Sequence, residues 1–179
     1  MNKIQKTSHI LHILFRVLCW AIPFATAYFI LFNIERMLNW GAWPFISFTQ
    51  IHDPAHYSLL HRLIILAIQL LPLSITVIIF NKLSKLFSLY EKGNLFEEEN
   101  IKLIKSISIY MILGELVQLI YQPLITAALT FNNPTGERFI SITLGSANAS
   151  TLITAFIILV ASWILKEANQ LQSDSQLTI

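Results

Sequence analysis

One acidic residue stands inside an apolar run of this sequence, and polar residues follow it at helical spacing. Glu115 is followed by Gln118, Gln122 and Thr126. Intervals of three, seven and eleven residues place these side chains on one face of a helix. An acid at membrane depth must be protonated, paired or hydrated. This polar stripe therefore predicts either a proton or ion relay or an interhelical hydrogen-bond clamp.

Partners for the stripe are present in other apolar segments. For a clamp we expect Gln69, Ser74 or Thr76 to bind it, through hydrogen bonds that average below about 1 kcal/mol in membranes. Arg16 is a candidate ion-pair partner of Glu115. The depths of these two residues differ by about 9 Å at the helical rise per residue, so both side chains must extend.

A second group of chemically active side chains contains three histidines. His52, His56 and His61 lie around Asp53, and imidazole and carboxylate are zinc ligands. Pro54 argues against a helix that would place His52 and His56 on one face. A solvated loop is the ordinary environment of such side chains. We therefore predict no metal site, with the three histidines as weak candidates.

A third candidate site lies in the charged segment 81–106. Apolar residues recur there at helical spacing as far as Tyr90, and Gly93 is a natural helix stop. Asn94 precedes Glu97 by three residues, a capping-box spacing that predicts the next helix start. The segment is interpreted as a helix hairpin. It either lies on anionic headgroups or binds a partner through Phe87, Tyr90, Gly93, Leu95, Phe96 and Asn100.

Four apolar segments must position these sites. The chain has 179 residues, of which 55% are hydrophobic and 12% charged, about half the charged fraction of soluble domains. Each segment is long enough to cross about 30 Å of hydrocarbon. The sequence thus predicts an all-α membrane protein with one four-span domain over 1–179. Its spans are predicted at about 10–33, 62–81, 103–130 and 144–165.

The distribution of positive charge predicts the orientation. Nine of the twelve Lys and Arg residues lie near the termini or between spans two and three, and only Arg36, Arg62 and Arg138 lie elsewhere. Positive charge favours the cytoplasmic side, so we predict both termini inside, with the hairpin between spans two and three cytoplasmic. Ala25-Thr26-Ala27 resembles a signal-peptide cleavage site, but apolar sequence continues beyond it and we expect an uncleaved span.

Several function classes are disfavoured. The sequence has no H-E-x-x-H, P-loop or G-x-S-x-G motif, so we predict no enzymatic activity and no cofactor. A net charge of +2 does not suggest direct nucleic-acid binding. Cys19, the single cysteine, excludes an intrachain disulfide. The segment between spans one and two carries Trp40 and Trp43, and we expect it to lie at the outer membrane–water boundary.

The chain resembles the YoaS-like bacterial membrane proteins, a family of unknown function of the DUF2975 type. The resemblance rests on Gly93-Asn94-Leu95-Phe96 followed by Glu99-Asn100 and an apolar helix, and on the ending 171–179. It implies a four-span layout over essentially the whole chain. A small helix-turn-helix regulator is often encoded near relatives, which implies a membrane partner for a transcription factor. Gln176 stands where relatives usually carry an acidic residue.

The leading hypothesis is a non-enzymatic, multi-pass protein of the bacterial inner membrane. In this hypothesis it is a regulatory or scaffolding partner of a cytoplasmic protein, bound through 81–106 and the tail. One alternative is a small transporter or ion-coupled channel component that uses Glu115, Gln118 and Gln122. Another is an accessory subunit of a larger complex, packed through the small residues Ala147, Thr151 and Ala155. A homodimer also fits.

Overall fold

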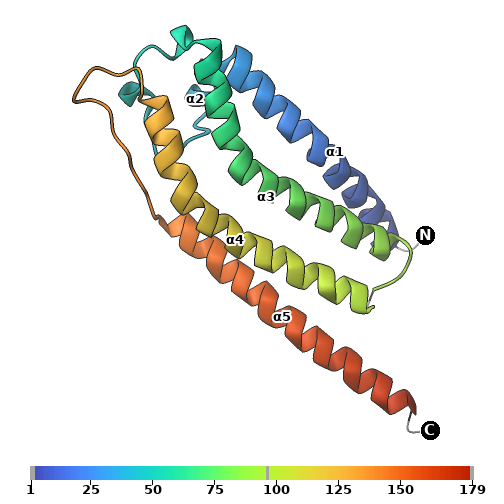
Figure 1. The fold of residues 1–179 in the computed structure, drawn as a ribbon. Coiled ribbons are helices and arrows are strands. Elements are labelled where there is room, and N and C mark those ends of the chain that lie inside the picture. The colour runs from blue at the N-terminus through green and yellow to red at the C-terminus, as the bar shows by residue number, and fades with distance from the viewer. Residues whose placement is uncertain (1–2, 96, 178–179) are drawn as a thin grey trace. The chain divides into compact units, whose positions relative to one another are not determined.

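The computed structural model describes residues 3–95 and 97–177, and helices dominate these ranges (Figure 1). No β-strand occurs in the part of the chain that is described, so the all-α prediction is confirmed. The elements in chain order are α1 (Lys3–Phe32), α2 (Ile34–Asn39), η1 (Phe48–Gln50), η2 (Pro54–His56), α3 (Leu59–Glu91), α4 (Glu98–Leu129) and α5 (Ser146–Leu177).

Four of these helices, α1, α3, α4 and residues 146–171 of α5, are long and apolar enough to span a membrane. Their outer faces carry large apolar side chains; Ile157 and Ile164 of α5 are each 64% exposed. Such surfaces suit hydrocarbon rather than water. The helices extend past the predicted spans: α3 has 33 residues, or about 50 Å, against about 30 Å of hydrocarbon.

The chain forms two compact units. Unit 1 comprises Met1–Trp20, Ile75–Glu115 and Ser146–Ile179, and unit 2 comprises Ala21–Ser74 and Leu116–Gly145. In unit 1, the Phe15 ring lies 5.7 Å from the rings of Phe80 and Phe87, which joins α1 to α3. His12 of α1 also donates to the carbonyl of Ser84 at 2.9 Å.

Unit 2 has a core in which the segment between α1 and α3 folds inward. Trp43 is 2% exposed and packs in a cluster with Ile30, Ile65 and Ile125. Trp43 thus packs inside the protein, whereas Trp40 of the same segment is exposed; that the segment lies at the outer membrane boundary stays a prediction. Burial of Trp43 satisfies its indole N–H within the protein, which an apolar core requires.

Arg62 fixes the same segment to the end of α1. Its guanidinium donates to three backbone carbonyls, those of Tyr57 (3.1 Å), Leu31 (2.6 Å) and Ala55 (2.7 Å). The last carbonyls of a helix lack intrahelical donors, and a cation is favoured at that end. Arg62 therefore acts as a side-chain cap for α1.

Candidate functional site

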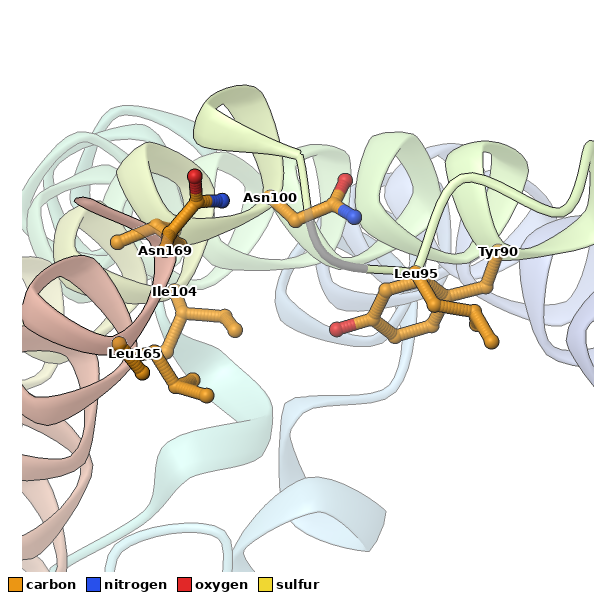
Figure 2. Close-up of a pocket in the computed structure, with 8 residues that line it drawn as sticks. Tyr90, Leu95, Asn100, Ile104, Leu165 and Asn169 are labelled. Atoms are coloured by element: carbon orange, nitrogen blue, oxygen red, sulfur yellow. The ribbon is translucent and has the colours of Figure 1, made fainter. Parts of the chain in front are cut away.

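A cavity of about 310 Å³ lies in unit 1 where α3 turns into α4, beside α5 (Figure 2). Most of its wall is apolar, with polar groups from Tyr90, Asn100 and Asn169. Three of the six residues predicted to bind a partner lie here. The lining residues are Tyr90, Leu95, Asn100, Ile101, Ile104, Leu165, Ala168 and Asn169.

The turn that builds one side of the cavity follows from Gly93. This residue has φ of +92°, a backbone conformation in which a Cβ is strained. The amide of Gly93 donates to the carbonyl of Tyr90 and the amide of Asn94 to that of Leu89, both at 3.1 Å. These two bonds form a Schellman motif that satisfies carbonyls at the end of α3. The prediction that Gly93 stops the helix is confirmed.

Asn100 closes the turn from the other side, in a way that the sequence did not predict. Its Nδ2 donates to the backbone carbonyl of Asn94 at 2.6 Å, and α4 begins at Glu98. The predicted capping box, with its helix start directly after Asn94, is therefore wrong. The contact with a carbonyl also fixes the orientation of the Asn100 amide, because only its nitrogen is a donor.

One polar atom at this cavity has no partner among the described residues. The Oδ1 atom of Asn100 is buried and accepts no hydrogen bond from the described residues. Figure 2 shows the Tyr90 ring beside Leu95, with its hydroxyl directed toward Ile104 and Leu165. Buried polar groups normally have a hydrogen-bond partner, so an unmatched acceptor in an apolar wall marks a place where a donor would be stabilised.

The other residues of the predicted partner surface lie differently. Phe87 stacks on Phe15 of α1, and its ring lies 6.0 Å from that of Tyr90. Phe87 is therefore part of the helix packing of unit 1 rather than of the cavity. Phe96 falls outside the described residues, as do residues 178–179 of the tail.

Sequence reasoning assigned the tail after residue 165 to the predicted partner surface but named none of its residues. Leu165, Ala168 and Asn169 of α5 line the cavity. The helical spacing of Leu165 and Asn169, four residues apart, is the signal that α5 continues with one face toward the cavity.

The polar stripe on α4 binds the chain that follows α4 rather than span two. Glu115 accepts a hydrogen bond from Nδ2 of Asn148 at 2.7 Å, within unit 1. The predicted ion pair with Arg16 does not occur among the described residues. The side chains of Gln118 and Arg16 form no hydrogen bond or ion pair there.

Gln122 and the two threonines after it hold a segment of extended chain within unit 2. The amides of Thr143, Ser141 and Phe139 donate to Gln122 (2.6 Å), Thr126 (3.2 Å) and Thr130 (3.3 Å), respectively. Every second residue of the extended segment meets every fourth residue of α4. The two spacings match, because two residues of extended chain rise about 6.6 Å and four residues of helix about 6 Å. The segment 139–143 thus runs antiparallel to α4 along this face (the irregular orange trace in Figure 1).

Gln69, the predicted partner from span two, belongs to a different network. The indole N–H of Trp43 lies 2.7 Å from the hydroxyl of Tyr121 and 3.2 Å from Oε1 of Gln69. Tyr121 donates in turn to Gln69 at 2.5 Å. Ser74 bonds only within its own helix, to the carbonyl of Leu71. The prediction that Gln69 or Ser74 binds the stripe is therefore wrong.

The three histidines have separate partners. His52 pairs with Glu137 and His56 with Asp53, both at 2.6 Å. His61 donates to the carbonyl of Ala128 at 2.6 Å. No group of three or more metal-binding side chains occurs in the described ranges. The hydrogen bond with Asp53, and then its charge, raise the pKa of His56 above its ordinary value.

Asn133 ties the two loops of unit 2 together. It is 1% exposed, and its Nδ2 donates to the carbonyls of Gln50 (2.7 Å) and Glu137 (3.1 Å). Its Oδ1 accepts from the amide of His52 at 3.0 Å. From the sequence, residues 132–136 were interpreted only as a helix breaker. The partners of Asn133 in the loop before α3 could not be predicted, because they lie 81 to 83 residues away in the chain.

Four helices of the described chain with this length and apolarity define the architecture of a multi-pass membrane protein. A family of proteins of unknown function, DUF2975, matches residues 42–179, more than three quarters of the sequence. The chain belongs to this family, and the predicted membership is confirmed. No curated protein and no solved structure matches it.

Proposed function

We propose that this chain is a non-enzymatic protein of the bacterial inner membrane that binds a cytoplasmic regulatory protein at the cavity between α3, α4 and α5. In this proposal both termini and the α3–α4 turn face the cytoplasm, as the distribution of lysine favours. The observation that carries the proposal is the unmatched Oδ1 of Asn100 at an apolar cavity.

The chemistry of the wall favours an apolar anchor with a donor beside it. The lining contains Leu95, Ile101, Ile104 and Leu165 and no charged residue. A cavity of about 310 Å³ is at the small end of ligand pockets and has room for one or two apolar side chains. Buried anchors of that kind dominate the affinity of protein interfaces. A backbone N–H or hydroxyl of the partner would supply the donor for Asn100.

The family resemblance supplies the class of partner, a small helix-turn-helix regulator. The test is co-purification in mild detergent of the full chain with the regulator encoded beside its gene. Ala168 is exposed and lines the cavity, so Ala168→Trp fills the space without disturbing buried packing. We expect the amount of bound regulator to fall about tenfold, which corresponds to about 1.4 kcal/mol.

The matched control is Ala161→Trp, at another exposed alanine of α5 that lies outside the cavity; this variant is expected to retain the regulator. Equal binding by both variants, or no binding by the natural chain, would contradict the proposal. Reporter fusions test the orientation separately. A fusion after Lys92 must be cytoplasmic and one after Thr135 must be outside.

A second candidate function, an ion-coupled transporter component, is favoured by one contact. The side chain of Asn148, in the first turn of α5, binds Glu115 inside an apolar region. Helices that begin within the membrane, with their N-terminal dipole near an acid or ion, form the sites of many transporters. Glu115→Gln keeps an acceptor for Asn148 and removes the charge. Loss of transport with unchanged unfolding supports this function, whereas a change in stability alone supports a structural clamp.

A further inference from the structure

The extended segment after α4, residues 139–144, has two backbone edges. One edge is hydrogen-bonded to α4, and the other, called the open edge, is not. The amides of Phe139, Ser141 and Thr143 point to α4 and are bound there, and the carbonyl of Phe139 also accepts from Thr130 at 3.2 Å. In extended chain the N–H and C=O of one residue point to the same side, and successive residues alternate. The backbone groups of Ile140, Ile142 and Leu144 therefore point away from α4.

No described residue supplies a hydrogen bond to this open edge. The backbone groups of Ile140 and Ile142 have no hydrogen bond among residues 3–95 and 97–177. The side chains of Ile140, Ile142 and Leu144 are 70%, 54% and 70% exposed, respectively. The open edge thus combines unpaired backbone with a row of large apolar side chains.

The depth of this edge makes its unpaired state costly. Gln122 precedes Thr130 by eight positions, and α4 ends at Leu129, so the segment descends about 12 Å along the helix from its end. With the end of α4 at the edge of a hydrocarbon layer of about 30 Å, Ile142 lies inside that layer. Non-helical backbone at this depth is tolerated only where protein covers it or where it lines a water-filled space. Apolar side chains along the edge disfavour the water-filled space.

We propose that a second copy of this chain covers the edge, with residues 140–144 of the two copies paired as antiparallel strands. An open edge must be matched by another open edge, because the backbone groups of a membrane helix are already bonded. Residues 138–145 form the longest run without helix or turn in the described chain. A two-fold axis near Ile142 makes the segment self-complementary, and no charge occurs between residues 139 and 165 to repel the copy.

The test is crosslinking in native membranes through a single cysteine. Cys19→Ser removes the natural thiol, and Ile142→Cys then places one thiol near the two-fold axis. A short bis-maleimide, which adds one cysteine thiol at each end, is expected to yield a product of twice the chain mass, about five times more than with Ile157→Cys, a control with similar exposure on α5. Equal yields at the two positions, monomer alone, or a product with a foreign protein would each overturn the proposal.

A proline variant separates edge pairing from simple proximity. Ile142→Pro removes an amide that binds nothing in the described chain and leaves the three bonds to α4 in place. Added to Cys19→Ser and Ile140→Cys, it is expected to abolish the dimer that Ile140→Cys traps, while circular dichroism and detergent stability stay unchanged. A dimer that survives Ile142→Pro would show that the backbone edge is not the interface.

Discussion

Replacing Asn133 with aspartate tests the joint between the two loops of unit 2. The side chains have almost the same shape, so packing around this buried position is preserved. An ionised aspartate still accepts from the amide of His52, but it donates nothing to the carbonyls of Gln50 and Glu137. The variant therefore loses two hydrogen bonds and places a negative charge against two carbonyl oxygens.

The size of the effect follows from these contacts. Two lost hydrogen bonds account for about 1–3 kcal/mol, and the unmatched carbonyls raise the expected loss in the free energy of unfolding to about 2–4 kcal/mol. The repulsion also raises the pKa of the new carboxyl group, because the neutral form donates one hydrogen bond. A carboxyl group with a raised folded pKa gains stability as pH falls, and the gain is complete below its unfolded pKa of about 4.

Unfolding in mixed detergent micelles, followed by circular dichroism at pH 7 and pH 5, measures both effects. Asn132→Asp is the matched control, because it makes the same chemical change at the neighbouring exposed position. We expect Asn133→Asp to be the less stable variant at pH 7 and to recover in part at pH 5. Equal stability of the two variants would refute the structural role assigned to Asn133.

Two further predictions concern unit 2. Asp53→Asn should lower the pKa of His56 toward its ordinary value of about 6.5, which a nuclear magnetic resonance titration measures. Because Asp53 raises the pKa of His56 in the folded protein, the stability that this pair contributes is present below pH of about 6.5. That stability is lost as pH rises through the folded pKa. An unchanged titration would show that the 2.6 Å contact does not persist in solution. Tyr121→Phe should cost only about 1 kcal/mol, because Trp43 keeps Gln69 as an acceptor. Trp43→Phe should cost about 2–4 kcal/mol, because it also removes volume from the core; equal losses in detergent unfolding would contradict this order.

The sequence predicted the features that depend on local chemistry. The four apolar helices follow from residue type and length, since hydrocarbon accepts such segments only as helices with satisfied backbones. Gly93 ends α3 because its positive φ is open to glycine without strain. The match to the family of unknown function was also visible in short motifs around Gly93 and Asn100.

The candidate cavity was predicted only in part. Tyr90, Leu95 and Asn100 lie close together in the sequence, and their spacing indicated a common surface. Leu165 and Asn169 complete the wall from a helix more than sixty residues further along the chain. Nothing local to that helix indicates which other helix it meets, because apolar side chains pack against any apolar neighbour.

The sequence by itself determined that the helices suit hydrocarbon rather than water, how many apolar helices there are, and that α4 carries a polar face. These features depend on side-chain type and helical period alone. Only the tertiary structure decided which groups satisfy that face. Glu115 could have met Arg16 or Gln69, and instead meets Asn148, while Gln122 binds the backbone of Thr143. A hydrogen bond requires two atoms within about 3 Å, and the distance between residues remote in sequence is set by the packing of whole helices.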